Sequence, residues 1–387
     1  MFSRWIQIDT SKSILLIGPR RSGKTTYLKS NFPNATYTTL DDWDAYEWAK
    51  QDPKAFITQL GPQAIIDEIQ RLPNLTIAVK YAIDEETATF YMTGSSNIGL
   101  LDVSAESLAG RIQIIHFPTA CWGEDEGPPL KESLTDPHSF PALKQAQRTL
   151  PDALKFGGFP EVLIQPDEKT KFQALQNYKN TYFTRDLMQL ANLENAEGIL
   201  ALYHYLIRSL GSHIEVQNVA RECGLSAPTA KKYLNALVQS GLTFKLYGYQ
   251  YGPAKRFIKA SKTYFADNGI LTSFNQSLSQ GQLVENFVIS ELEKRRKLGF
   301  IQADSLYYYK SISGREIDVL YTENNRLHAI EIKATSTPTP KDIRNLKEFA
   351  AHHDKPCKLI LFYMGTTYQE QAGVNLIPIA SLYRSRG

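Results

Sequence analysis

The first stretch whose residue types could do chemistry is Ser13–Thr26, in which Gly18 and Gly23 enclose four residues ahead of Lys24 and Thr25. The glycines allow a tight turn whose N–H groups point into one concavity. A lysine there reaches β- and γ-phosphates, and a hydroxyl ligates Mg²⁺. A glycine-rich turn with a chance lysine is the alternative. The order of apolar strand, loop and helix favours a phosphate-binding loop, whose expected contacts are Gly18, Pro19, Arg20, Arg21, Ser22, Gly23, Lys24, Thr25 and Thr26.

A pair of acids, Asp67 and Glu68, follows the continuous apolar run Ala64–Ile66. Such a run is typical of a strand that is buried on both faces of a parallel sheet. Ligands lie beyond the carboxyl ends of these strands, which is where both acids fall. We expect Asp67 to hold Mg²⁺, directly or through water, and Glu68 to polarise an attacking water. The alternative is an acidic pair that only caps the next helix.

Two arginines and one polar strand end are further candidates for this site. Arg111 could neutralise charge in the transition state, in its own subunit or a neighbouring one, but a surface salt bridge is an equal alternative. Arg185 could reach the phosphates from a helical lid, or it could pair with Asp186. The polar strand end at 93–97 could sense the γ-phosphate, although Ser95, Ser96 and Asn97 are also ordinary turn residues.

A second acidic constellation lies near the end of the chain. Side chains alternate along a strand, so Glu331 and Lys333 project together, opposite Ile330 and Ile332, while Asp318 lies opposite Ile317, Val319 and Tyr321. With Glu285 on a preceding helix, this is the arrangement of restriction-endonuclease-like nucleases. Asp318 and Glu331, with the Ile332 carbonyl, would bind Mg²⁺. Lys333 would position water and steady phosphate charge, and Glu285 would orient metal-bound water or a second ion.

The alternative for this second constellation is a plain ion pair between Glu331 and Lys333. Such an exposed pair contributes only about 0–1 kcal/mol, so it is common. It does not account for the further acids Asp318 and Glu285 in the same neighbourhood.

The segment 216–239 has helix-turn-helix form, with Ser226 as a cap and Pro228 in the first turn of the second helix. A β-wing is expected to follow, and its basic residues suit contact with DNA phosphates. The alternative is a winged helix that serves only to pack domains together. The basic residues of the wing are Lys245, Lys255, Arg256, Lys259 and Lys262.

These candidates must be positioned by several domains, because 387 residues exceed one ordinary domain. The repeated strand–loop–helix pattern predicts an α/β fold with a doubly wound parallel sheet over 1–150. A helical lid over 151–210, a winged helix over 211–265 and an α/β restriction-endonuclease-like domain over 266–387 are expected to follow. The tract 122–141 is rich in Pro, Gly and acids and is expected to be a surface excursion or hinge.

Composition limits the functional classes without choosing among them. A net charge of +3 neither requires nor excludes nucleic acid. Three dispersed cysteines suggest neither disulfides nor a zinc site. We find no signal peptide and no apolar run long enough for a membrane span, so a cytoplasmic protein is expected. The absence of an NKxD-type motif favours ATP over GTP.

The order of motifs resembles bacterial and archaeal AAA+ P-loop ATPases that end in a DUF4143-type domain with a nuclease-like fold. This resemblance implies ATP and Mg²⁺ as ligands and places Lys24, Thr25, Asp67 and Glu68 in the roles above. It also implies a winged helix and a restriction-endonuclease-like tail around Glu285, Asp318, Glu331 and Lys333. The matching segments are GPRRSGKT, TTLDD, IIDEIQ, MTGSS, SLAGR, GGFPE, TYFTRDL, YFADNGI, GQLVENFV, GREIDVL and IEIKA.

From these features we expect an Mg-ATP-dependent ATPase that acts on or near DNA. The alternative is an ATP-controlled switch or scaffold with an inactive nuclease-like domain. Such a switch would bind a protein partner or associate with itself.

Overall fold

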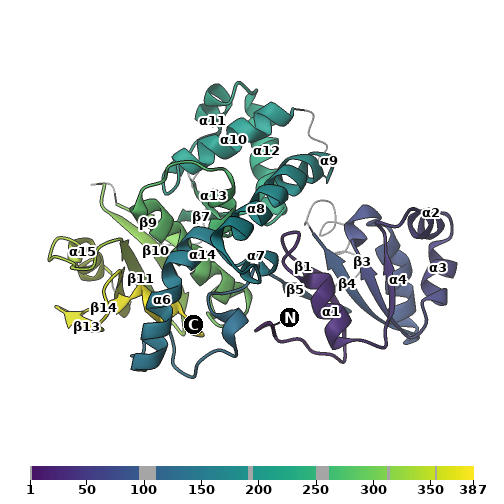
Figure 1. The fold of residues 1–387 in the computed structure, drawn as a ribbon, viewed down its shortest axis with the longest axis horizontal. Helices are drawn as coiled ribbons and strands as arrows, with labels where there is room; N and C mark the ends of the chain where they lie inside the picture. The colour runs from purple at the N-terminus through teal and green to yellow at the C-terminus, as the bar shows by residue number, and fades with distance from the viewer. Residues whose placement is uncertain (1, 96–109, 191–194, 250–260, 312–313, 354) are drawn as a thin grey trace. The chain divides into compact units, whose positions relative to one another are not determined.

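The structure is a computed structural model that describes residues 2–95, 110–190, 195–249, 261–311, 314–353 and 355–387 (Figure 1). Its contacts divide the chain into two compact units, which are described separately below. The N-terminal unit comprises residues 6–119 and 239–241. The C-terminal unit comprises residues 1–5, 120–238 and 242–387.

A five-stranded sheet in the order β2-β3-β4-β1-β5 forms the centre of the N-terminal unit. Every pairing in it is parallel, as the repeated strand–loop–helix pattern predicted. Its strands are β1 (Ser13–Ile17), β2 (Thr36–Thr39), β3 (Gln63–Asp67), β4 (Thr89–Gly94) and β5 (Ile112–His116). The helical elements are α1 (Lys24–Asn31), α2 (Trp43–Gln51), α3 (Pro53–Gln59), η1 (Ile69–Arg71) and α4 (Leu75–Asp84).

Helices cover both faces of this sheet, because its central strands β1, β3 and β4 are buried on both faces. On one face, Leu15 and Ile66 pack against residues of α2, α3 and α4, such as Phe56 and Val79. On the other face, the ring of Phe32, just after α1, stacks on Tyr91 at 3.6 Å. The carboxyl ends of β1, β3 and β4 therefore lie together at one edge, where α1 begins.

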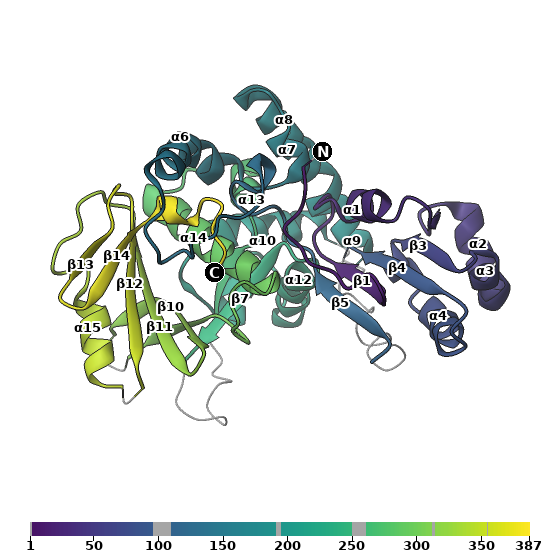
Figure 2. The same cartoon turned by 90° about the horizontal axis from the view of Figure 1, so that it is seen from below.

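A nine-stranded mixed sheet in the order β13-β14-β12-β11-β10-β9-β7-β8-β6 forms the C-terminal unit (Figure 2). The β10–β11 hairpin turns at Asn324 and Asn325, which both have positive φ, as a tight hairpin requires. The strands are β6 (His213–Ile214), β7 (Thr243–Gly248), β8 (Ser261–Phe265), β9 (Tyr307–Lys310), β10 (Glu316–Glu323), β11 (Arg326–Lys333), β12 (Cys357–Tyr363), β13 (Gln369–Gln371) and β14 (Val374–Pro378).

The two faces of this sheet pack against different helices. Val319 and Ile330 face the core that contains α14, whereas Leu320 and Ala329 face the core that contains α15. The helical elements of the unit are η2 (Glu124–Glu126), α6 (Phe140–Phe156), α7 (Pro160–Leu163), α8 (Glu168–Tyr178), η3 (Lys179–Asp186), α9 (Leu187–Leu190), α10 (Ala196–Arg208), α11 (Val216–Glu222), α12 (Ala227–Gln239), α13 (Asn268–Ser273), α14 (Gln280–Lys297), α15 (Arg344–Ala351) and η5 (Ile379–Leu382).

The expected winged hairpin belongs to this large sheet. β7 and β8 pair antiparallel, as a wing would, but β7 also pairs parallel with β9. Hydrogen bonding therefore continues across residues 265 and 266, where we placed a domain boundary.

The tract 122–141 is anchored by a few buried residues, whereas most of its residues from 125 onward are half-buried or exposed, as its composition suggested. Trp122 and Leu134 are buried in the main core of the C-terminal unit. The buried Glu124 carboxylate accepts hydrogen bonds from the backbone N–H groups of Trp5 and Cys121 at 2.5 and 2.8 Å. Proline and glycine correctly indicated irregular backbone here, but they carry no information about burial.

A buried cluster of charges ties α14 to two loops of the C-terminal unit. Asp267, with no exposed surface, accepts hydrogen bonds from the N–H groups of Gly158 and Gly269, both at 2.9 Å. Lys294 Nζ lies 3.1 Å from Asp267 and 3.1 Å from Glu291. Burial alone would lower the pKa of Lys294, but these two carboxylates outweigh it and raise that pKa. The cluster is thus internally compensated.

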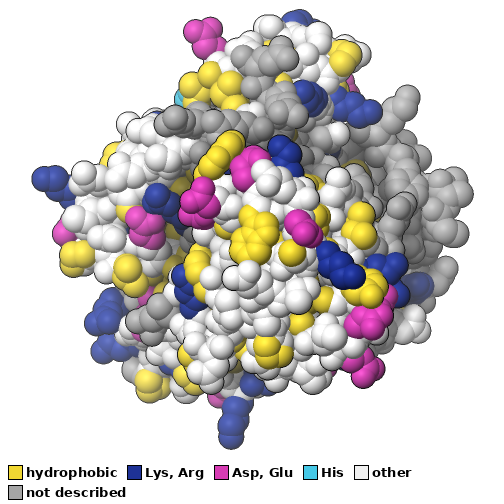
Figure 3. Space-filling view, turned by 90° about the vertical axis from the view of Figure 1, so that its right-hand side faces the viewer, with side chains coloured by type: hydrophobic (Ala, Val, Ile, Leu, Met, Phe, Trp, Pro, Cys, Tyr) yellow, Lys and Arg dark blue, Asp and Glu magenta, His cyan; other side chains and the backbone are white. Residues whose placement is uncertain are grey.

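Hydrophobic side chains on the surface occur in small groups. On the face drawn in Figure 3, they lie between acidic and basic side chains. Among the described residues of the N-terminal unit, Trp43, Ile77 and Tyr81, on α2 and α4, are the most exposed large examples. Among the described residues, no helix is both long enough and apolar enough to cross a lipid bilayer.

Replacing Asp267 with alanine should destabilise the C-terminal unit by about 3–5 kcal/mol, because it leaves Lys294 charged and buried without one of its partners. The measurement is hydrogen exchange of the slowest amides of α14, followed by mass spectrometry. Glu370→Ala, at an exposed position of β13, is the control and should change protection by less than about 0.5 kcal/mol. Equal protection in both variants would contradict the role given to the charge cluster.

Candidate functional site

The phosphate-loop pattern forms the predicted turn between β1 and α1. A side chain at Gly18 would place its Cβ 1.9 Å from the Phe117 carbonyl oxygen, so only glycine fits there. Gly23 has φ of 94°, a conformation that other residues rarely adopt. α1 begins at Lys24, so its N-terminal N–H groups face the loop.

Lys24 is buried within this loop. Its Nζ donates hydrogen bonds to the carbonyl oxygens of Gly18 and Pro19, both at 2.9 Å. Burial lowers the pKa of Lys24 to about 8, although the nearby Glu68 and Asp67 oppose that effect. A further negative group close to Nζ would therefore stabilise the ammonium form.

The carboxylate of Asp67 accepts hydrogen bonds from three hydroxyl groups. Thr25 Oγ1 donates to Asp67 Oδ1 at 2.8 Å, and the Thr93 hydroxyl donates to the same oxygen. The Tyr37 hydroxyl donates to Oδ2 at 3.1 Å, and burial together with Asp67 raises the pKa of Tyr37 to about 12. Tyr37 was not among our predicted residues, whereas Thr93 begins the polar strand end that we expected near the γ-phosphate. Their signal was position, because β2 and β4 flank β3 and polar residues near parallel strand ends converge.

The Glu68 carboxylate is held by Ser95, which follows β4, and by Gln70 of η1. The Glu68 backbone adopts φ of 59°, a sparsely populated conformation for a residue with a side chain. Ser95 Oγ donates to Glu68 Oε2 at 2.9 Å, and Gln70 donates to the same oxygen. Ser95 was a predicted candidate, whereas Gln70 was missed. Residues 96 and 97 lie outside the described residues.

Of the two candidate arginines, the structure describes the side chain of Arg111 but not that of Arg185. The Arg111 guanidinium pairs with Asp84 at the surface, which is the salt bridge that we kept as an alternative. Arg185 belongs to η3, and its side chain is outside what the structure describes.

In the C-terminal unit, Asp318 lies on an irregular part of β10. The pairing with β9 gains one residue on β10 between Ile317 and Leu320, which is a β-bulge. Ile317 consequently packs on the α15 side and Val319 on the α14 side, so our prediction that they share one face is wrong. The Ile332 N–H donates to Asp318 Oδ2 at 2.8 Å, which fixes the carboxylate beside β11.

Glu331 and Lys333 project together from β11, as alternation predicted. Lys333 Nζ lies 3.1 Å from Glu331 Oε2. Glu331 is only 2% exposed, and its Oε1 finds no hydrogen-bond partner among the described residues. Burial and then Asp318 raise the pKa of Glu331 to about 8, against the opposing effect of Lys333.

Glu285 reaches the same neighbourhood from α14. Tyr264 donates its hydroxyl to Glu285 Oε1 at 2.7 Å. Burial and the nearby Asp318 raise the pKa of Glu285. Among the described residues, no three His, Cys, Asp or Glu side chains are grouped closely enough to hold one metal ion. Asp318 thus raises the pKa of both glutamates, but the three carboxylates do not converge on a single point.

Lys262 differs from its predicted place in a basic wing. Its side chain is 4% exposed and forms an ion pair with Glu316. Burial alone would lower the pKa of Lys262, but Glu316, Asp318 and Glu285 outweigh it and raise that pKa. Lys262 is therefore part of the acidic cluster and not of a phosphate-binding surface.

The helix-turn-helix segment is formed by α11 and α12. Ser226 Oγ accepts the Thr229 N–H at 3.2 Å, and Ala230, Tyr233, Leu234 and Leu237 are buried. Lys231 and Lys232 are exposed on α12. Burial and the nearby Lys231 lower the pKa of Lys245. The other predicted wing cations, at positions 255, 256 and 259, lie outside the described residues.

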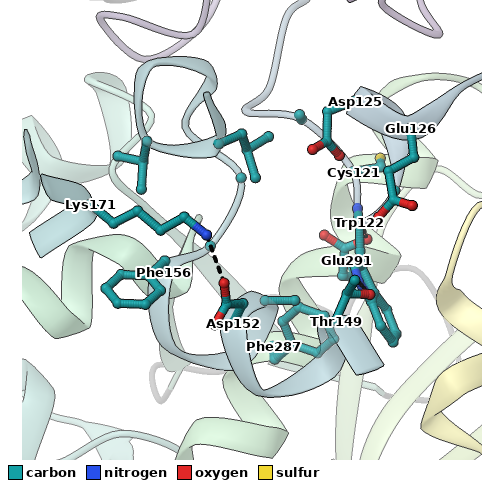
Figure 4. Close-up of a pocket in the computed structure, with 17 residues that line it drawn as sticks. Cys121, Trp122, Asp125, Glu126, Thr149, Asp152, Phe156, Lys171, Phe287 and Glu291 are labelled. Carbon is teal, nitrogen blue, oxygen red and sulfur yellow. Dashed lines mark hydrogen bonds and ion pairs between the residues drawn. The ribbon is translucent and has the colours of Figure 1, made fainter. Parts of the chain in front are cut away.

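A small cavity of about 110 Å³ lies elsewhere in the C-terminal unit (Figure 4). Asp152 and Lys171 pair at 2.6 Å on one side, and Cys121 and Asp125 lie on the other. Burial raises the pKa of the Cys121 thiol, so this cysteine stays protonated and unreactive. We assign this cavity no function.

Three sequence families match the chain in succession. The family described as AAA domain matches residues 10–124, which contain the phosphate loop and Asp67. A domain of unknown function (DUF8612) matches residues 147–280, and another (DUF4143) matches residues 280–382.

Two similar curated relatives carry the description uncharacterized protein. One, from Mycobacterium tuberculosis, is 26% identical over 347 residues, covering 84% of this chain and 71% of the relative. Another, from the archaeon Methanocaldococcus jannaschii, is 25% identical over 358 residues, covering 88% and 79%.

Among solved structures, the RuvB Holliday junction branch migration motor of Thermotoga maritima is similar over 60% of this chain and 82% of its own. The identity is 19% and the TM-score is 0.29, so this similarity carries no argument about function. The family matches bear out the resemblance that the motifs indicated: the chain has an N-terminal AAA domain followed by a DUF8612 and a DUF4143 domain, and its relatives are uncharacterized proteins of bacteria and archaea.

Proposed function

We propose that this chain is an Mg-ATP-dependent ATPase that acts on or near DNA. The hydrogen bond of 2.8 Å between Thr25 and Asp67 is the observation that carries the ATPase proposal. It joins the hydroxyl after the phosphate-loop lysine to an acid at the end of a parallel strand. These are the two protein groups that hold Mg²⁺ beside β- and γ-phosphates in P-loop enzymes.

Each residue of this site has a proposed task. Residues 18–26 bind the triphosphate through backbone N–H groups, and Lys24 pairs with the β- and γ-phosphates. Thr25 and Asp67 would hold Mg²⁺, which supplies charge neutralisation when bound. Glu68 orients and polarises the attacking water, and Ser95 with Gln70 fixes its carboxylate. The hydroxyls of Tyr37 and Thr93 keep Asp67 in place. Arg111 and Arg185 remain predictions for charge neutralisation in the transition state.

The proposal of DNA as a partner is supported by the helix-turn-helix form of α11 and α12 and by exposed Lys231 and Lys232. Phosphate contacts give affinity without sequence information, so this support concerns binding and not specificity. Fewer basic residues support DNA binding than the sequence analysis expected, because Lys262 is buried in an ion pair with Glu316 and belongs to the acidic cluster.

We also propose the domain roles expected from the sequence. Residues 1–150 are the ATPase domain, 151–210 a helical lid, 211–265 a winged helix and 266–387 a restriction-endonuclease-like domain. Because β7 pairs with β9, the wing and the last domain should move as one body. ATP hydrolysis would then move the wing and the last domain together relative to the ATPase domain. It would not move the wing relative to the last domain.

A second candidate function, metal-dependent cleavage of DNA, is favoured by the buried, unpaired oxygen of Glu331. An acid in that position beside Asp318 requires a positive partner or a proton. Asp318 and Glu331 have the hard oxygen ligands that Mg²⁺ prefers. Lys333 would steady phosphate charge. The rival proposal is an ATP-controlled switch whose nuclease-like domain is inactive and binds a protein partner or a second copy.

Lys24→Ala should abolish ATP turnover, because it removes the cation that pairs with the phosphates. Release of phosphate is measured with and without DNA in the presence of Mg²⁺. Lys50→Ala, an exposed lysine on α2, should turn over ATP like the wild type. DNA-stimulated turnover would support action on DNA. Undiminished turnover by Lys24→Ala would end the ATPase assignment.

ATP affinity should fall as pH rises above 8. Burial lowers the pKa of Lys24 to about 8, so at lower pH the lysine is charged before ATP arrives. At higher pH, ATP must bind together with a proton, which lowers affinity by about tenfold for each further unit of pH. Titration with a fluorescent ATP analogue at pH 7 and 9.5 measures the change. A pH-independent affinity would show that Lys24 stays charged throughout.

If the tail is a nuclease, Asp318→Ala should lose Mg²⁺- or Mn²⁺-dependent cleavage of plasmid and linear DNA. Glu370→Gln, at an exposed position of the same sheet, should cleave like the wild type. Intact DNA in all three reactions would favour the scaffold. Capture of a protein partner without DNA retention at low salt would point to the same conclusion.

A further inference from the structure

Tyrosine side chains gather on one face of the large sheet, where β7 pairs with β9. Tyr307 and Tyr309 of β9 pack against the core that contains α15, whereas Tyr308 between them belongs to the core that contains α14. Tyr247 of β7 pairs in parallel register with Tyr307, so its side chain projects from the same face. Tyr249, which follows β7, also packs against the α15 core. We call Tyr247, Tyr249, Tyr307 and Tyr309 the tyrosine row.

The tyrosine row is accessible to solvent but held in position by ring contacts. Tyr247 is 44% exposed, and the other three tyrosines are half-buried. The ring centres of Tyr249 and Tyr307 lie 5.8 Å apart, with the ring planes at 72°. The Tyr309 ring lies 4.9 Å from the Phe349 ring of α15. An aromatic surface that stays accessible over several neighbouring residues is typical of a binding site.

A pocket of about 500 Å³ adjoins the row at Tyr309. Arg315, Asn345 and His352, from the start of β10 and from α15 and its end, are among the residues that line it. Arg315 pairs with Glu348 at 2.7 Å, but the arginine side chain is 49% exposed. Because such an exposed pair contributes little, a phosphate group can replace the carboxylate as the partner of the guanidinium.

Positive charge continues from this pocket along α15. Arg344 and Lys347 are exposed on the helix, whose single acid, Glu348, is the partner of Arg315. Accessible rings beside cations suit single-stranded nucleic acid, because bases stack on the rings while phosphates contact the cations.

The spacing of the row favours a single strand over a duplex. Tyr307 and Tyr309 are two residues apart on one strand, so their side chains leave the backbone about 6.6 Å apart. Neighbouring bases in a duplex are only about 3.4 Å apart and are stacked on each other. Only an unpaired strand can therefore place successive bases on successive rings.

We propose that the tyrosine row and the Arg315 pocket bind single-stranded nucleic acid. Bases stack on the rings, and Arg315 contacts the phosphate backbone. Stacking tolerates any sequence, because every base has a π-face. This inference rests on the proposed action on or near DNA and deepens it, since it names an unpaired strand as the ligand and places that strand on a surface other than α12.

The test measures the fluorescence anisotropy of a labelled oligothymidylate of about 12 nucleotides, mixed with the full-length chain at low salt without ATP. Tyr247→Ala should weaken binding by about fivefold to a hundredfold, the loss expected for one stacked base. Tyr247→Phe keeps the ring and should bind like the wild type. Trp43→Ala removes an exposed ring of the N-terminal unit and should also leave binding unchanged. Arg315→Gln should weaken binding and reduce the salt slope by about 0.7.

Two competitors test the same surface without any substitution. An abasic oligomer of equal length and charge should displace the label much less well than oligothymidylate, because it cannot stack. A duplex of the same length should also displace it poorly, whereas oligouridylate should compete well.

The inference is overturned if the wild type does not bind the oligomer, if Tyr247→Ala binds it like the wild type, or if the abasic oligomer or the duplex competes equally well. In each of these cases, ATP turnover that duplex DNA stimulates would leave the proposed function standing. Conversely, ring-dependent binding by a chain whose turnover ignores DNA would support the tyrosine row and count against the proposed action on DNA.

Discussion

A buried charge needs an opposite charge or a proton nearby, and this constraint shapes both units of the chain. Around Asp267 the requirement is met, since Lys294 and backbone N–H groups surround the carboxylate. At Lys24 it is met only by loop carbonyls and by more distant acids. At Glu331 one oxygen has no partner among the described residues. The first arrangement holds the fold together, and the other two are suited to receive ligands of opposite charge.

The two candidate sites use sheets in different ways. In the N-terminal unit, parallel strands bring Tyr37, Asp67 and Thr93 to one edge, beside the start of α1. In the C-terminal unit, a bulge in β10 turns Asp318 toward β11. Regular alternation would not place Asp318 between Glu285 of one face and Glu331 of the other, so the irregular residue is what joins the acids.

Several sequence predictions about the fold were confirmed because they depend on local patterns. The strand before Gly18 and the strand formed by the apolar run before Asp67 each lie where expected. Predictions that depended on distant partners were less successful. Trp122 and Leu134, in a tract that we expected at the surface, are buried in the core, and Lys262, which we expected on a basic surface, forms a buried ion pair with Glu316.

By itself, the sequence determined the phosphate loop, the acids that end β3 and the alternation of Glu331 and Lys333, because spacing along the chain sets the direction of these side chains. Only the tertiary structure decided which groups stand beside them. Tyr37 and Lys262 reach the sites from neighbouring strands, and no matching motif contains them; Gln70 and Thr93 lie in the segments IIDEIQ and MTGSS, but those motifs did not reveal which acid each residue contacts. The physical reason is that burial and electrostatic neighbours are properties of packing, which a short stretch of sequence does not contain.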